Sequence, residues 1–187
     1  MTEPRILLLD GCSGSGKSSF KNALLSDERF TFQYVKRYTT RVRRPDDIGN
    51  DDYHFVSQET FNHMVVTNQL AEYRRYLFGM AYGLRTADVM DALQEGKNAL
   101  GLMNLGAVDM ARSSLPEASI VLIDTPIEDI EARLRARNYH SEEQIRERLE
   151  NARTVNSFRN KYDYVCQNRN GFFATAYEGL VKFLELA

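Results

Sequence analysis

A glycine-spaced loop near the N-terminus gives the clearest chemical signal in this sequence. The stretch GCSGSGKS, residues 11–18, fits the pattern G-x-x-x-x-G-K-[ST] at every fixed position. Glycines let such a loop curl until its backbone N–H groups point at phosphate oxygens, and the positive end of the following helix adds to the attraction. Lys17 would reach the β- and γ-phosphates, and the hydroxyl of Ser18 would be a ligand for Mg²⁺. The pattern predicts a nucleoside triphosphate site formed by Gly11, Ser13, Gly14, Ser15, Gly16, Lys17, Ser18 and Ser19.

A second cluster of positive charge lies at residues 37–44, in the stretch RYTTRVRR, with Tyr53 soon after it. Arginine forks bind phosphate groups in bidentate fashion. A charge cluster is more commonly a solvated loop. Here the cluster ends a strand of a chain that carries a phosphate-binding loop, which favours a site for the phosphate of a second substrate.

Further arginines occur in RLRAR, residues 133–137, and on the next predicted helix, which carries Arg148. Phosphoryl transfer places negative charge on the oxygens around the moving group, and arginines that close over it exclude water and stabilise that charge. The alternative is that these arginines pair with glutamates on the helix surface. A GTPase would need a guanine-reading N-K-x-D motif, which the sequence lacks. The pattern therefore indicates a small-molecule kinase.

Strands and helices alternate over most of the chain, which predicts an α/β fold: a parallel core sheet with helices on both faces. The expected core strands are 5–10, 98–104, 119–124 and 162–167, and helices are expected from Lys17, Thr86, Pro126 and a Ser141 capping box. Residues 33–83 are richer in strands and are predicted to be an acceptor-binding insertion. A strand is expected at 31–37, where this section begins, and a helix capped by Ser57 and a hairpin turning near Gly79 are expected within it. One domain is expected, with its core at about 1–32, 84–136 and 158–187 and a helical lid at about 137–157.

Composition limits the classes of partner. The chain has 187 residues, of which 43% are hydrophobic, and its net charge of -2 argues against a nucleic-acid or anionic-membrane binder. The apolar run ILLL is too short for a signal peptide, and no stretch approaches a membrane span. Two isolated cysteines, Cys12 and Cys166, indicate a reducing cytoplasm. We expect small-molecule substrates, and either a monomer or a homodimer.

The chain resembles the guanylate kinase family over essentially its full length. The matching stretches, in the same order and spacing, are GCSGSGKSS, TTRVRRP, DYHFVS, LAEY, Tyr82-Gly83, RLRARNYHSEEQIRERL and YDYVCQN. The resemblance implies a P-loop kinase with a core sheet, a strand-rich acceptor-binding domain and a mobile lid. It also implies Mg²⁺-dependent phosphoryl transfer from ATP to a nucleoside monophosphate, in the first place GMP, which would give GDP and ADP.

The resemblance assigns acceptor contacts by position. Arg41, Arg44 and Tyr53 match residues that bind the acceptor phosphate in the family, and Tyr82 matches a further acceptor contact. Glu72 matches the carboxylate that accepts hydrogen bonds from the guanine edge.

Lid and donor residues are assigned in the same way. Arg137 and Arg148 match lid arginines on the transferring phosphates, Arg133 lies beside them, and Asn168 sits where the family flanks the donor adenine. The expected catalytic residues are Lys17, Arg41, Arg137 and Arg148.

Several positions depart from the family pattern. Arg37 stands where the family usually has a serine, and Leu84 stands where it has Ser or Thr directly after the Tyr-Gly pair. Gly101 and Met103 stand where the family has two acidic residues, one of which helps to recognise guanine. Of the side chains that recognise the base, Glu72 alone is retained. With these acids replaced, Asp10 and Asp124 become candidates to support the water shell of Mg²⁺.

Two alternatives follow from these departures. Arg37, counted among the acceptor-binding residues, suggests more negative charge on the acceptor. Ribose 1,5-bisphosphate phosphokinases share the Arg-Tyr before Thr-Arg and an apolar residue after Tyr-Gly, so ribose 1,5-bisphosphate, giving phosphoribosyl diphosphate, is the second hypothesis. The third is a non-catalytic guanylate kinase-like module, although such modules typically lose the phosphate-binding loop that is complete here.

Overall fold

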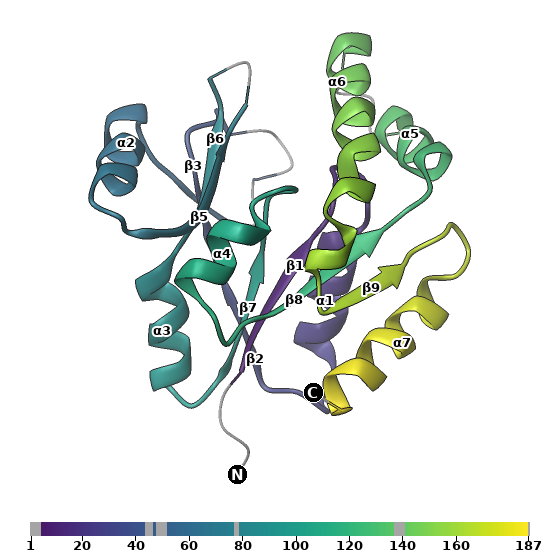
Figure 1. The fold of residues 1–187 in the computed structure, drawn as a ribbon, viewed down its shortest axis with the longest axis horizontal. Coiled ribbons are helices and arrows are strands. Elements are labelled where there is room, and N and C mark those ends of the chain that lie inside the picture. The colour runs from purple at the N-terminus through teal and green to yellow at the C-terminus, as the bar shows by residue number, and fades with distance from the viewer. Residues whose placement is uncertain (1–4, 44–46, 48–51, 77–78, 137–140, 187) are drawn as a thin grey trace.

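A five-stranded parallel sheet lies at the centre of the computed structural model, which describes residues 5–43, 47, 52–76, 79–136 and 141–186 (Figure 1). Its strand order is β2-β7-β1-β8-β9, and every pairing is parallel. The strands are β1 (Ile6–Asp10), β2 (Phe32–Val35), β7 (Asn98–Leu102), β8 (Ser119–Asp124) and β9 (Tyr164–Gln167). All five residues of β1 are buried, as expected for a central strand covered on both faces.

Helices cover both faces of this sheet. On one face, α1 (Lys17–Ser26) and α7 (Phe173–Leu186) pack against the side chains of Leu7 and Leu9 from β1. The cluster on the other face includes Leu8 and draws on α3 (Thr86–Gln94), α4 (Val108–Ser114), α5 (Ile127–Ala136) and α6 (Glu142–Arg153). The predicted α/β class is therefore confirmed. The capping box is confirmed as well, because Ser141 accepts from the Gln144 N–H and Gln144 accepts from the Ser141 N–H.

A second, four-stranded sheet has the order β4-β3-β6-β5. Its strands are β3 (Arg37–Thr39), β4 (Tyr53–Phe55), β5 (Leu70–Arg75) and β6 (Ala81–Arg85), and α2 (Gln58–Val66) packs on it through Phe61 and Met64. The hairpin predicted near Gly79 is confirmed: the N–H of Gly79 donates to the carbonyl of Tyr76 between β5 and β6. Ser57 caps α2 as predicted, accepting from the N–H of Thr60.

Two local predictions are wrong. The single strand expected at 31–37 is two strands, because the chain leaves the core sheet after β2 and joins the second sheet at β3. An alternating pattern cannot show this change of sheet, since both strands have the same period. The sequence also suggests Thr86 as a cap of the helix that follows it, but Thr86 is the first residue of α3 and the capping position is Arg85.

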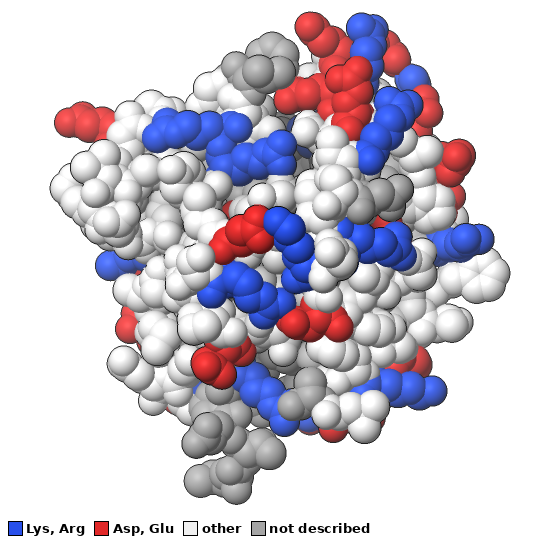
Figure 2. All heavy atoms as spheres, viewed as in Figure 1, with Lys and Arg blue, Asp and Glu red and all other residues white. Residues whose placement is uncertain are grey.

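Most of the segment predicted to be a lid forms α6, which projects from the core and contacts α5 alongside it (Figure 1). Two short 3₁₀ turns, η2 (Thr154–Ser157) and η3 (Arg159–Lys161), lead from α6 to β9. Figure 2 shows basic and acidic side chains interspersed over this face of the molecule, with both kinds at the end where α6 projects. Within the described residues, every helix is too short or too polar to cross a membrane.

Candidate active site

The phosphate-binding loop joins the buried end of β1 to the first turn of α1. Its backbone requires glycine at two points: Gly11 has a φ of 147°, and Gly16, the capping residue of α1, has a φ of 101°. A Cβ atom on Gly11 would lie 2.6 Å from the carbonyl oxygen of Ile123, and one on Gly16 would clash with the Asn168 amide. Only a loop without these Cβ atoms keeps this curled shape, which is the form of cradle that binds phosphate.

Side chains behind the loop hold its carbonyl groups. The carbonyl oxygen of Ser15 accepts hydrogen bonds from Asn168 Nδ2 at 2.7 Å, Thr125 Oγ1 at 2.9 Å and Arg133 Nη1 at 3.2 Å. Arg133 Nη1 also donates to the carbonyl of Gly14 at 3.1 Å. Because a trans peptide is planar, fixing the Ser15 carbonyl also fixes the N–H of Gly16 in the opposite direction.

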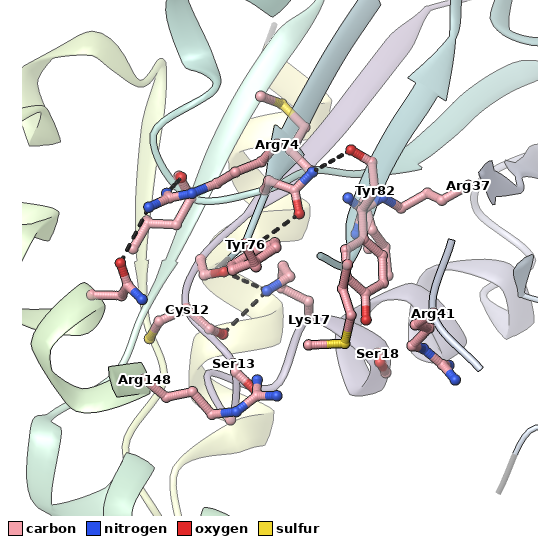
Figure 3. A pocket seen from close by; sticks show the side chains of 18 of the residues that line it. Cys12, Ser13, Lys17, Ser18, Arg37, Arg41, Arg74, Tyr76, Tyr82 and Arg148 are labelled. Carbon is pink, nitrogen blue, oxygen red and sulfur yellow. Dashed lines mark hydrogen bonds between the residues drawn. The ribbon is translucent and has the colours of Figure 1, made fainter. Parts of the chain in front are cut away.

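A cavity of about 240 Å³ lies between this loop, the second sheet and α6 (Figure 3). The predicted site residues that line it are Gly11, Ser13, Gly14, Gly16, Lys17, Ser18, Ser19, Arg37, Arg41, Tyr53, Tyr82 and Arg148. Ser15, Glu72, Arg133 and Asn168 are described but are not among its lining residues. Arg44 and Arg137 lie outside the described residues. The cavity thus brings together three segments that are far apart in the sequence.

Positive charge dominates the described lining of the cavity. Its cationic side chains are Lys17, Arg37, Arg41, Arg74 and Arg148, and the carboxylate among the lining residues is Glu147. Figure 3 shows Arg148 on one side of Lys17 and Arg37 with Arg41 on the other. Such a lining suits ligands that carry several phosphate groups.

Lys17 and the nearby acidic residues are held by bonds within the protein. Lys17 Nζ donates to the carbonyl oxygens of Gly11 and Cys12. Asp10 is fully buried, and its two oxygens accept from the Gly11 N–H at 2.6 Å and the Tyr162 hydroxyl at 2.7 Å. Burial raises the pKa of Asp10 above its usual value.

Asp124 has partners of its own. Its Oδ2 accepts from Arg159 Nη1 at 2.6 Å and from Gln167 Nε2 at 2.9 Å. Neither Asp10 nor Asp124 is among the described residues that line the cavity, so their suggested support of a Mg²⁺ water shell stays a prediction.

Arg41 forms a bidentate ion pair at the edge of the cavity. Its Nη1 and Nη2 atoms donate to the two carboxylate oxygens of Asp47 at 2.5 and 2.6 Å. The guanidinium also lies 4.9 Å from the ring centre of Tyr53 and is buried. The Asp47 carboxylate occupies the Nη1–Nη2 fork of Arg41, so a phosphate bound in bidentate fashion would use the Nε–Nη2 side of the guanidinium or displace Asp47.

Arg37, Leu84 and Glu72 form one row across the second sheet. Leu84 on β6 is directly opposite Arg37 on β3 and Glu72 on β5. Arg37 Nη2 lies 3.7 Å from Glu72 Oε1, and Glu72 Oε2 accepts from Asn104 Nδ2 at 3.0 Å. Burial raises the pKa of Glu72 to about 7, although the charge of Arg37 and the bond from Asn104 oppose this.

Comparisons with known proteins agree with this geometry. The family model described as "Guanylate kinase" matches residues 3–187. The chain is 32% identical over 164 residues to a guanylate kinase of Lactobacillus johnsonii, covering 87% of this chain and 80% of that one. It is 28% identical over 166 residues to the guanylate kinase of Bacillus subtilis, covering 88% and 81%.

The chain belongs to the guanylate kinase family. It is therefore an ATP-dependent kinase, a phosphotransferase. A solved structure of guanylate kinase from Anaplasma phagocytophilum has the same fold, with a TM-score of 0.73 and 22% identity over 98% of this chain and 86% of that one. These comparisons support neither of the two alternative functions considered above.

This member of the guanylate kinase family has cavity residues that the sequence analysis missed. Among them are Arg74, Tyr76, Met80, Asn104, Glu147 and Asn151. Arg74 donates to the carbonyl of Leu105 and, at 3.2 Å, to Asn151 Oδ1 on α6. The sequence did contain a signal that could have identified Arg74 and Tyr76 as site residues. They follow Glu72 at intervals of two residues, and residues with this spacing lie on the same face of a strand.

Proposed function

We propose that this chain transfers the terminal phosphoryl group of ATP to GMP, forming GDP and ADP. Membership of the guanylate kinase family supports this activity, and one structural observation carries it further. The phosphate-binding loop with Lys17, the stretch after β3 with Arg41, and α6 with Arg148 all face one cavity. A donor and an acceptor bound on opposite sides of that cavity would meet at their phosphates.

The donor phosphates would lie in the loop from Gly11 to Ser19. Its N–H groups and the start of α1 favour negative charge, and Lys17 would bind the β- and γ-phosphates. Arg133 and Asn168 hold the loop from behind through the carbonyls of Gly14 and Ser15. We assign both residues to keeping the donor site in shape.

The residues present fit a magnesium ion that is bound mainly through substrate. Ser18 lines the cavity in the first turn of α1, where its hydroxyl would be a ligand. The described residues contain no group of three or more His, Cys, Asp or Glu that could hold a metal, and Mg²⁺ is commonly held by phosphates, water and few protein ligands. When bound, the ion would neutralise charge on the β- and γ-phosphates.

The acceptor phosphate would lie against Arg41, Tyr53 and Tyr82, which line the cavity opposite the loop. Arg148 on α6 would stabilise the charge that develops on the moving group. The attacking phosphate oxygen is already anionic, so the reaction needs no general base. Most of the rate enhancement would come from holding the two phosphates in line in a site closed to water.

ADP formation with a panel of nucleoside monophosphates tests this proposal. With ATP, Mg²⁺ and GMP, turnover should exceed the rate without acceptor by orders of magnitude. Lys17→Ala should reduce it about 100-fold or more, the loss seen when one charge-stabilising donor is removed. Lys97→Ala is the matched control, because Lys97 pairs with Glu95 on the exposed surface. No ADP above background with GMP would overturn the proposal.

A further inference from the structure

Lys21 is a buried lysine on α1, the helix that starts in the phosphate-binding loop. The residue is 5% exposed, and its Nζ atom donates to Asp52 Oδ1. The same nitrogen lies 4.6 Å from the ring centre of Tyr34. Lys21 follows Lys17 by four residues and Ser18 by three, so the three side chains share one side of the helix. The side of α1 that carries two donor-binding residues therefore also carries a buried positive charge.

The ion-pair partner of Lys21 belongs to the other sheet. Asp52 directly precedes β4, and its backbone carbonyl accepts from the Arg37 N–H on β3 at 3.3 Å. Tyr34, whose ring lies beside the ammonium group, is on β2 of the core sheet. The ammonium group of Lys21 therefore lies where the donor helix, the edge strand of the core sheet and the start of β4 meet.

The position of β4 matters because its first residue reaches the cavity. This strand has three residues, lies at the edge of its sheet and pairs with β3. Tyr53 lines the cavity, and its ring centre lies 4.9 Å from the Arg41 guanidinium carbon and 6.1 Å from the ring centre of Tyr82. One planar peptide bond joins Asp52 to Tyr53, so a displacement of Asp52 would pass directly to Tyr53.

The ion pair between Lys21 and Asp52 serves geometry better than stability. Removing an ammonium group and a carboxylate from water costs free energy, and apolar side chains of similar volume commonly stabilise a protein equally well or better. Neither residue is among the described residues that line the cavity, so the pair acts from behind the site. The pair fixes the distance between α1 and the start of β4.

We infer that Lys21 is a positioning residue for the acceptor phosphate. Its ion pair with Asp52 holds Tyr53 at a set distance from the phosphate-binding loop, so that an acceptor bound by Tyr53 presents its phosphate to the donor. Because Lys17 and Ser18 lie on the same helix as Lys21, the donor site and this acceptor contact are both fixed to α1. The inference rests on the proposed transfer of phosphate to a nucleoside monophosphate, in which Tyr53 binds the acceptor phosphate.

Two variants test this role, with urea unfolding and ADP formation measured for each. Lys21→Met removes the positive charge, and Lys21→Met/Asp52→Asn removes both charges, so that no lone carboxylate remains. In both, the KM for GMP should rise about 10-fold, as when one hydrogen bond to a charged group is lost, and the KM for ATP should change by less than about 2-fold. The double variant should unfold at nearly the same urea concentration as the unaltered enzyme. Lys182→Met, at an exposed position on α7, is the control and should change neither KM.

A double-mutant cycle tests whether Lys21 acts through Tyr53. Tyr53→Phe removes the hydroxyl that would contact the acceptor phosphate and should itself raise the KM for GMP about 10-fold. In that background, Lys21→Met should add less than about 2-fold, because the contact that Lys21 positions is already lost. Independent effects, which would multiply to about 100-fold, would overturn the inference.

The outcomes separate this inference from the proposed function. Equal rises of the two KM values, or a normal KM for GMP in the double variant, would assign Lys21 a purely structural role while GMP kinase activity stands. No turnover by the unaltered enzyme with any nucleoside monophosphate would overturn the proposed function and the inference together. If Lys21→Met does not fold, the double variant decides, because it leaves neither charge unpaired.

Discussion

Leu84 and Gly101 fit together as a pair beneath the acceptor side of the cavity. A Cβ atom on Gly101 would lie 3.0 Å from Cδ2 of Leu84 and 2.7 Å from Cδ2 of Leu8. Leu84 is 0% exposed, so it has no free space into which to turn. Both residues are departures from the family pattern. The structure explains why they occur together, because the leucine needs the space that a larger residue at 101 would fill.

Gly101→Ala is expected to lower the free energy of unfolding by about 1–3 kcal/mol through overpacking. Leu84→Ala should cost about 2–5 kcal/mol because it leaves a cavity. The double variant should cost less than the sum, since Leu84→Ala removes the 3.0 Å contact and leaves space into which the Leu8 side chain can shift away from the new methyl group. Urea unfolding measures all three. The control pair is Gly101→Ala with Leu180→Ala, a buried leucine in the cluster on the opposite face, which should be additive. Additivity in the first pair would contradict the fit.

Asn168→Ala is expected to weaken binding of ATP much more than binding of the acceptor. The substitution removes one of three hydrogen bonds to the Ser15 carbonyl, worth about 1 kcal/mol, so the loop should stay folded but be held less firmly. The KM for ATP should rise about 5-fold and the KM for GMP should change little. Asn62→Ala, at an exposed position on α2, is the control. Equal changes in both KM values would contradict this role.

Local patterns in the sequence were enough to predict much of the core. The loop at 11–18 has a fixed pattern, and the capping box at Ser141 involves residues three apart. The alternation of strands and helices indicated the parallel sheet. In each case the residues that interact are close in sequence, or the period of one element carries the information.

Contacts between residues on different strands and helices could not be predicted from such local patterns. Arg37, Glu72 and Leu84 were each noticed as single positions, but their common row depends on the register of three strands. The bond from Arg74 to Asn151 joins β5 to α6 across 77 residues. No periodicity in one element carries this information, because it arises only when separate elements pack together.

The buried carboxyl of Glu72 should make stability fall as pH rises toward neutrality. Its pKa is about 7 in the folded protein, above the usual value of 4.5 for a glutamate, so the folded state binds more protons between these values. The free energy of unfolding should therefore fall by up to about 3 kcal/mol between pH 4.5 and 7 and level off above that. Unfolding in urea at several pH values, with Glu72→Gln as the reference, isolates this effect. A difference between the two proteins that does not change with pH would contradict it.

Arg74→Ala is expected to lower kcat by loosening α6, the helix that carries Arg148. Arg74 Nη2 donates to Asn151 Oδ1 at 3.2 Å and so ties the second sheet to α6 across the cavity. Losing a hydrogen bond from a charged group should reduce kcat about 10-fold or more. Asn151→Ala removes the same bond from the other side and should have a similar effect. The neighbouring Arg75 donates to Asn62 at 2.8 Å on the exposed surface, so Arg75→Ala should leave kcat unchanged. Full activity in Asn151→Ala together with low activity in Arg74→Ala would assign the effect to the charge of Arg74 instead of its bond to α6.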